Sequence, residues 1–112
     1  MDWRLRNDGS RLVAAPIGRV DEESWKEFST HLTAAVRDAV AASVPLIIDL
    51  SGLRFMDSSA LHVILRANRA MDRDGGVVAL ASPRDPVAKM LRLTAADQLI
   101  PVFPSVSEAI AG

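Results

Sequence analysis

Residues Phe55 to Arg69 read FMDSSALHVILRANR, and within this stretch the chain passes from a strand-like apolar pair into a helical pattern. The helical pattern continues to Met71, with apolar residues three and four positions apart on one face. An aspartate and two serines stand at the junction, where a side-chain oxygen can accept hydrogen bonds from the free N–H groups of a helix start. The stretch is therefore either an ordinary helix start capped by Asp57 or Ser58, or a site where chemistry takes place at Ser58.

The rest of the chain alternates between short apolar runs and amphipathic patterns. Four apolar runs predict strands, namely Arg11–Ile17, Pro45–Leu50, Val77–Ala81 and Leu99–Phe103. Pro16 has no N–H to donate. We therefore expect the first of these strands to lie at an edge of the sheet, or Pro16 to lie at the end of the strand.

Each helical pattern begins at a residue that favours a helix N-terminus. Asp21 precedes a stripe of apolar residues and is expected to cap the first helix. Asp85 followed by Pro86 predicts an N-cap and a first helical position. Ser105 and Glu108 have the spacing of a capping box, which predicts a short final helix. With the helix of the opening stretch, the sequence predicts about four helices.

Strands that alternate with helices are typical of an α/β fold whose central sheet is largely parallel. We expect a single domain over residues 1–112, with a mixed, largely parallel central sheet of four to five strands. In such a sheet the loops that leave the carboxyl ends of the strands gather at one edge. The loops that contain Asp21, Asp57–Ser59 and Ser82 are therefore expected at that edge.

The composition excludes several classes of function. The 112 residues are 49% hydrophobic and 24% charged, which is typical of a folded globular chain. There is no cysteine, so disulfides, thiolate nucleophiles and cysteine-ligated metals are excluded. The formal net charge of -1 gives no general attraction to nucleic acid or to an anionic membrane. The start of the chain is charged and no apolar run approaches membrane-spanning length, so we expect a cytoplasmic protein without membrane insertion.

Three segments, in order along the chain, resemble a known family. They are GRVD at Gly18–Asp21, IDLSGLRFMDSSAL at Ile48–Leu61, and the pair LASP and PVFPSV within Leu80–Val106. Together they resemble STAS domains, specifically the stand-alone anti-sigma factor antagonists. The resemblance implies a STAS-like α/β fold and a bacterial switch protein in the cytoplasm. It also implies that the unphosphorylated chain binds an anti-sigma factor, itself a serine/threonine kinase, and so releases a sigma factor.

The resemblance further implies roles for individual residues. Ser58 corresponds to the phosphoacceptor, whose modification abolishes binding, while Asp57 flanks it and Asp21 matches an acidic residue on the neighbouring loop. Many family members have glycine at the positions of Ala60 and His62, and the bulky His62 is the larger departure. The expected partner-binding residues are Asp21, Asp57, Ser58, Ser59, His62, Arg66 and Ser82.

Other functions are compatible with parts of the same pattern. A STAS module can also serve as an adaptor, for example in a stressosome-like assembly or a lipid-transport complex, with the same surface and another partner. Ser58 and His62 could form a nucleophile and a base, but the G-x-S-x-G elbow and an evident oxyanion hole are missing, so we expect no enzyme activity. Asp21, Asp49 and Asp57 could suit Mg²⁺, but caps and strand ends account for them, so we expect no metal and no cofactor.

A cationic stripe on the second predicted helix is formed by His62, Arg66, Arg69 and Arg73. This stripe is either a solvated face, with Arg73 favourable near the helix C-terminus, or an electrostatic contact with an acidic partner. Direct nucleic-acid binding is not expected, because the overall charge is balanced and aromatic residues for base stacking are few. The sequence makes no prediction of an oligomeric state.

Overall fold

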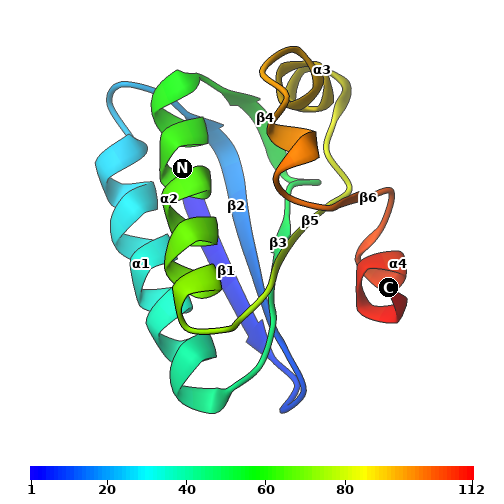
Figure 1. The fold of residues 1–112 in the computed structure, drawn as a ribbon. Coiled ribbons are helices and arrows are strands. Elements are labelled where there is room, and N and C mark those ends of the chain that lie inside the picture. Colours follow the sequence, from blue (N-terminus) through cyan, green and yellow to red (C-terminus); the bar gives the residue numbers. More distant parts are fainter.

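The computed structural model describes residues 1–112, in which strands and helices alternate along the chain (Figure 1). The elements are β1 (Asp2–Asn7), β2 (Leu12–Val20), α1 (Trp25–Ala42), β3 (Leu46–Asp49), β4 (Leu53–Met56), α2 (Ser58–Arg73), β5 (Val78–Ala81), α3 (Asp85–Leu93), the 3-10 helix η1 (Ala96–Gln98), β6 (Val102–Phe103) and α4 (Val106–Ala111). All strand pairs are parallel except β1 with β2. The mixed, largely parallel sheet with four α-helices confirms the α/β fold class that the sequence predicts.

The pairing of β2 with two successive strands positions the candidate site. The order across the sheet is β1-β2-β3-β5-β6, and β4 also pairs with β2. β3 pairs with Leu12–Ala14 at the start of β2, whereas β4 pairs with Gly18–Val20 at its end. The chain therefore leaves β3, turns at Ser51 and Gly52, and continues as β4 in the same direction along the same side of β2. As a result, the loop that follows β4 lies next to the loop that follows β2.

Helices cover the two faces of the sheet unequally. α1 and α2 lie side by side on one face and run in the same direction (Figure 1). The main core of 25 buried residues joins the sheet to α1, α2 and α3, and within it Phe28 and Ile64 have no exposed surface. α4 packs on the opposite face, against a small cluster of Val13, Ile47 and Ala81. None of the helices combines the length and the apolar character that a membrane span requires.

The N-terminal strand β1 is absent from the sequence prediction, although charged and apolar residues alternate in DWRLRN as they do in a strand with one exposed face. In the structure it is an edge strand that pairs antiparallel with β2, and nearly all its side chains are exposed. The exception is Trp3, whose ring stacks on His31 at a centroid distance of 5.1 Å and meets Phe28 edge-on at 6.2 Å. Aromatic contacts with α1 therefore anchor this edge strand.

The prediction that Pro16 marks an edge strand or a strand end is wrong. β2 is an interior strand, with β1 on one side and with β3 and β4 on the other. N–H groups two residues apart point to the same side of a strand, and the Gly18 N–H donates to the Gly52 carbonyl on the β4 side. Pro16 therefore faces the gap between β3 and β4, where Ala15–Ile17 have no parallel partner. A missing donor at this point removes no hydrogen bond of the sheet.

The first helix begins later than the sequence predicts. Its N-cap is Ser24 and its first residue is Trp25, so the expected capping role of Asp21 is wrong. The Asp21 carbonyl accepts hydrogen bonds from the N–H groups of both Ser24 and Trp25. These bonds form a turn ahead of the regular helix, and Asp21 lies in that turn.

The C-terminal elements follow the predicted order with shifted boundaries. α3 begins at Asp85 itself, so this residue is not the N-cap that the sequence predicts. β6 covers only Val102–Phe103, because Leu99 and Ile100 belong to the turn and bend that follow the 3-10 helix Ala96–Gln98. Ser105 does cap α4, and its hydroxyl oxygen accepts a hydrogen bond from the Glu108 N–H at 3.1 Å.

We predict that Leu53→Ala destabilises the fold strongly, because Leu53 has no exposed surface and anchors β4 in the core. The expected loss in the free energy of unfolding is about 2–5 kcal/mol, measured by urea denaturation. Leu93→Ala is the matched control, because Leu93 is 76% exposed, and it should change stability by less than about 0.5 kcal/mol. Equal losses in the two variants would contradict the described packing of β4.

Candidate functional site

Asp57 is the N-cap of α2, and its side chain organises the first turn of this helix. One carboxylate oxygen, Oδ1, accepts hydrogen bonds from the N–H groups of Ser59 at 3.1 Å and Ala60 at 3.3 Å. The same oxygen accepts a hydrogen bond from the Ser59 hydroxyl at 2.5 Å. The Asp57 N–H donates to the Val20 carbonyl at 3.2 Å, which ties the start of α2 to the end of β2. Of the two candidates for the cap, Asp57 therefore has the role and Ser58 does not.

The two adjacent serines differ in exposure and in hydrogen bonding. Ser58 is the first residue of α2, and its side chain is exposed outside the hydrogen bonds of the cap. Ser59 is partly buried, and its hydroxyl is held by Asp57. Ser58 is therefore the serine that a modifying enzyme could reach without breaking the cap of α2.

Asp21 lies in the turn between β2 and α1, where its carboxylate accepts two hydrogen bonds. Its Oδ1 is 3.0 Å from the Glu23 N and 3.2 Å from the Ser24 hydroxyl oxygen. The Glu23 N–H is the main cause that holds the pKa of Asp21 below its ordinary value, and the Ser24 hydroxyl adds to this effect. Asp21 therefore keeps its negative charge throughout the physiological pH range.

The loops that contain Asp21 and Asp57 adjoin, as expected for the ends of parallel strands. β2 and β4 end level with each other, because Val20 pairs with Met56. A shallow depression at this place is lined by Asp21, Glu22, Glu23, Phe55 and Asp57. All of these side chains except the phenyl ring are carboxylates, so the surface next to Ser58 is acidic. We refer to it below as the acidic depression.

Phe55 and Arg19 belong to this region and are missing from the sequence prediction of the site. The Arg19 guanidinium lies over the Phe55 ring, 4.5 Å from its centroid, and Phe55 is 37% exposed. The two residues are partners in the pairing of β2 with β4. The sequence offers only a weak signal for this contact, in that each residue precedes one of the two site aspartates by two positions.

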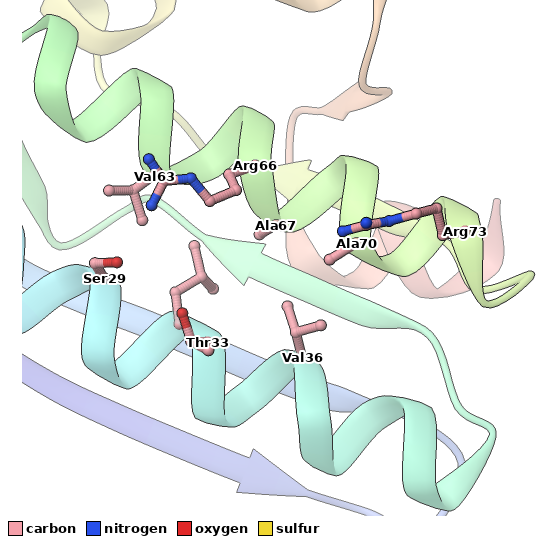
Figure 2. Close-up of a pocket in the computed structure, with 9 residues that line it drawn as sticks. Ser29, Thr33, Val36, Val63, Arg66, Ala67, Ala70 and Arg73 are labelled. Carbon is pink, nitrogen blue, oxygen red and sulfur yellow. The ribbon is translucent and has the colours of Figure 1, made fainter.

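His62 and Arg66 are exposed and lie about one and about two turns along α2 from Ser58. The structure places them on the same helix as Ser58 but outside the acidic depression. Arg66 instead lines a groove between α1 and α2 (Figure 2). Arg66 therefore lies beside a second surface feature, which differs from the depression in charge, whereas His62 lines neither of them.

Ser82 is placed apart from the acidic depression. It follows β5, whose last residue Ala81 pairs with Asp49 at the end of β3, whereas the depression lies beyond β3, where β4 ends. The Ser82 N–H donates to the Phe103 carbonyl at 2.9 Å, and the Ser82 backbone has a left-handed φ of 57°. The structure therefore does not bring Ser82 together with Ser58, and its part in partner binding stays a prediction.

The three aspartates that could suit Mg²⁺ by their chemistry lie in two separate places. Asp49 accepts a hydrogen bond from the Ser51 N–H at 3.0 Å in the turn that follows β3. Asp21 and Asp57 lie together in the acidic depression, where each is bonded to N–H groups of its own loop. No group of three or more His, Cys, Asp or Glu side chains is placed to hold a metal ion.

Comparison with known proteins identifies the family. A family model described as the STAS domain matches residues 4–109, so the chain belongs to the STAS domain family. It is 27% identical over 109 residues to the anti-sigma-F factor antagonist RsfA of Mycobacterium tuberculosis, which covers 95% of this chain and 82% of RsfA.

Two solved structures show the same fold. A STAS domain protein from Planctomyces limnophilus, described as an anti-sigma-factor antagonist, is similar with a TM-score of 0.88 at 24% identity, over 99% of this chain and 97% of that one. The anti-sigma factor antagonist SpoIIAA in its unphosphorylated form is similar with a TM-score of 0.78 at 21% identity, over 97% and 93% of the two chains. The predicted family and fold are thus confirmed.

We predict that Asp57→Ala lowers the free energy of unfolding by about 1–2 kcal/mol, because the first turn of α2 loses its cap. Asp57→Asn keeps an acceptor oxygen and should cost less. Ser58→Ala is the matched neighbouring control and should change stability by less than about 0.5 kcal/mol, because Ser58 takes no part in the cap. Urea denaturation compares the three variants, and a loss for Ser58→Ala equal to that for Asp57→Ala would show that the cap is wrongly assigned.

We predict that Ser24→Ala raises the pKa of Asp21, because one of the hydrogen bonds that stabilise its carboxylate is lost. The pKa of Asp21 in the folded protein lies below its ordinary value of 3.8, so the ionised carboxylate stabilises the fold above that pH. This contribution disappears as the pH falls through the lowered pKa. Carboxyl NMR titration measures the change, and Asp8, whose lowered pKa depends on Ser10 and Arg11, is the internal control that should not move.

Proposed function

We propose that the protein is a phosphorylation-controlled antagonist of an anti-sigma factor, and that this anti-sigma factor is itself a serine/threonine kinase. The chain would bind the anti-sigma factor in the cytoplasm while Ser58 is unmodified, and a sigma factor would thereby be released. Phosphorylation of Ser58 would end the binding. This role requires no catalysis and no cofactor in the chain itself, because a kinase brings its own nucleotide and metal.

The observation that supports the proposal best is the contrast between Ser58 and Ser59. Ser58 is exposed at the start of α2, next to the loop that contains Asp21. The Ser59 hydroxyl, by contrast, is bonded to Asp57. A kinase would therefore find one accessible hydroxyl in this pair. Asp57 and Asp21, in the adjoining acidic depression, would take part in recognition by the kinase.

The local charges favour a change of surface rather than a change of fold on phosphorylation. A phosphate adds about -1.5 to -2 charges at neutral pH. The N–H groups of Ser59 and Ala60, which could otherwise hold it, are already bonded to Asp57. The neighbouring depression is lined by four carboxylates, and the Arg19 guanidinium over the Phe55 ring is a single cation beside them. The new charge would therefore remain on the surface, where an approaching protein meets it.

The energetic effect of such a phosphate is large enough to act as a switch. A partner that packs closely on Ser58 would have to desolvate the phosphate or place it against like charges, at a cost of several kcal/mol. Each ~1.4 kcal/mol changes the dissociation constant about tenfold. The relatives described as anti-sigma factor antagonists support the choice of partner.

We predict that Ser58→Ala binds the anti-sigma factor permanently, whereas Ser58→Asp binds at least about tenfold more weakly, because it adds a charge at the contact. Isothermal titration with the purified anti-sigma factor measures both dissociation constants. Ser107→Asp is the matched control, because Ser107 is an exposed serine on α4, on the opposite face of the sheet. Equal affinity of the Ser58→Ala and Ser58→Asp variants for the anti-sigma factor would contradict the electrostatic explanation of the switch.

Phosphopeptide mapping of the protein from its host, during growth and under stress, tests the switch directly. Phosphate on Ser58 that changes with condition, with none on Ser59, is the expected result. Ser58 unmodified under every condition would favour the alternative, a STAS adaptor without sigma-factor control.

A further inference from the structure

The groove between α1 and α2 has an apolar floor and a cationic edge (Figure 2). Its floor includes Val36 from α1 and Val63 and Ala67 from α2, each of which keeps a small exposed surface. Arg66 and Arg73 line the α2 side, and their side chains extend along the helix beside the groove (Figure 2). The apolar and cationic parts of this surface are thus contiguous.

The arginines of α2 have no acidic partner within the chain. The two ion pairs of the protein join Arg11 to Asp8 and His31 to Glu27, and neither includes a residue of the groove. Asp72 lies near Arg66, Arg69 and Arg73 in a neighbouring hollow but forms no ion pair with them. The positive charge beside the groove is therefore available to an external group.

The α1 side of the groove is lined by uncharged residues, with exposed cations close to it. Ser29 and Thr33 line it, and neither is charged. Lys26 and Arg37 are exposed and lie three and four positions from them, so they share this side of the helix. Glu27 is turned away from the groove, toward the His31 side of α1. Cationic side chains thus flank the groove on both helices, and no acidic residue lines it.

We propose that this groove docks an amphipathic helix with acidic residues along one edge, contributed by a protein partner. The apolar side of such a helix would lie on the floor, and its carboxylates would face Arg66 and Arg73. These two arginines are seven positions apart, or about 10.5 Å along α2. The partner helix is therefore expected to present Asp or Glu about two turns apart beside its apolar residues.

The shape of the surface favours a protein helix over a membrane. Membrane attachment requires large apolar side chains that project from the surface. The exposed large hydrophobic residues of the protein are Leu5, Phe55, Val77, Leu93, Leu99 and Ile110, and none belongs to α1 or α2. The apolar groups between these helices are recessed, so they fit side chains that protrude from a partner. α1, α2 and α3 already bury their apolar faces in the core, and α4 has a single acidic residue, which disfavours a second copy of the chain as the occupant.

This docking surface goes beyond the proposed switch. Arg73 lies about four turns along α2 from Ser58, so a helix in the groove would not need to touch the phosphoacceptor. The groove and the acidic depression are also opposite in charge. They could therefore contact different parts of one partner or two different partners.

Photo-crosslinking in the host tests the proposal. The photoreactive residue p-benzoylphenylalanine replaces Thr33 in the groove, or Asn7 on β1 as a positional control, in the full chain. Mass spectrometry then identifies the peptide that is joined to it. We expect a peptide from another protein, joined at Thr33 and not at Asn7, with acidic and apolar residues at helical spacing.

Charge neutralisation provides the second readout. Arg66→Gln with Arg73→Gln should lower the crosslinking yield at Thr33 by roughly tenfold, whereas the matched pair Arg4→Gln with Arg6→Gln should leave it unchanged. Glutamine retains helix propensity, and thermal unfolding verifies that both variants are folded. The proposal is overturned by a crosslink to lipid, to a second copy of the chain or to a peptide without acidic residues. It is also overturned by no crosslink specific to Thr33, or by equal yields in the two double variants.

Discussion

The parallel pairing of β4 with the end of β2 is the constraint on which the candidate site depends. β3 occupies only the start of β2, so the chain can pair with β2 again as β4 and extend the sheet beyond the end of β3. Val20 and Met56 then lie opposite each other, and the Asp57 N–H bonds to the Val20 carbonyl. Without this pairing, the loops of Asp21 and Asp57 would not form a common surface. The buried side chains of β4 and the start of α2 hold the pairing in place.

The capping of α2 links the stability of the fold to the chemistry of its surface. Asp57 uses one carboxylate oxygen to bond Ser59 and Ala60, which fixes the first turn and takes up the donors of the helix start. Ser58 is left exposed beside an acidic surface. One face of the molecule is thus acidic near the start of α2, while the groove along α1 and α2 is flanked by cations. A partner that contacts both regions would be oriented by their opposite charges.

The errors of the sequence prediction share a physical origin in tertiary packing. β1 is short and highly charged, and Trp3 anchors it to the fold by packing on α1. Pro16 has the local signature of an edge and is tolerated in the interior because two strands divide one side of β2. Ser82 follows a parallel strand like Asp21 and Asp57, yet β5 ends level with β3 rather than with β4. Local patterns contain no information on how far along its neighbour each strand is paired.

The sequence by itself determined the α/β class, the order of most elements, the family and the importance of the segment around Asp57 and Ser58. These features follow from residue periodicity, helix-start chemistry and short motifs, all of which are local along the chain. Only the tertiary structure decided which serine is exposed, that Asp21 and Asp57 share a depression, and that Arg66 borders an apolar groove. Each of these depends on contacts between segments far apart in sequence, because the sheet register and the packing of α1 on α2 place the side chains.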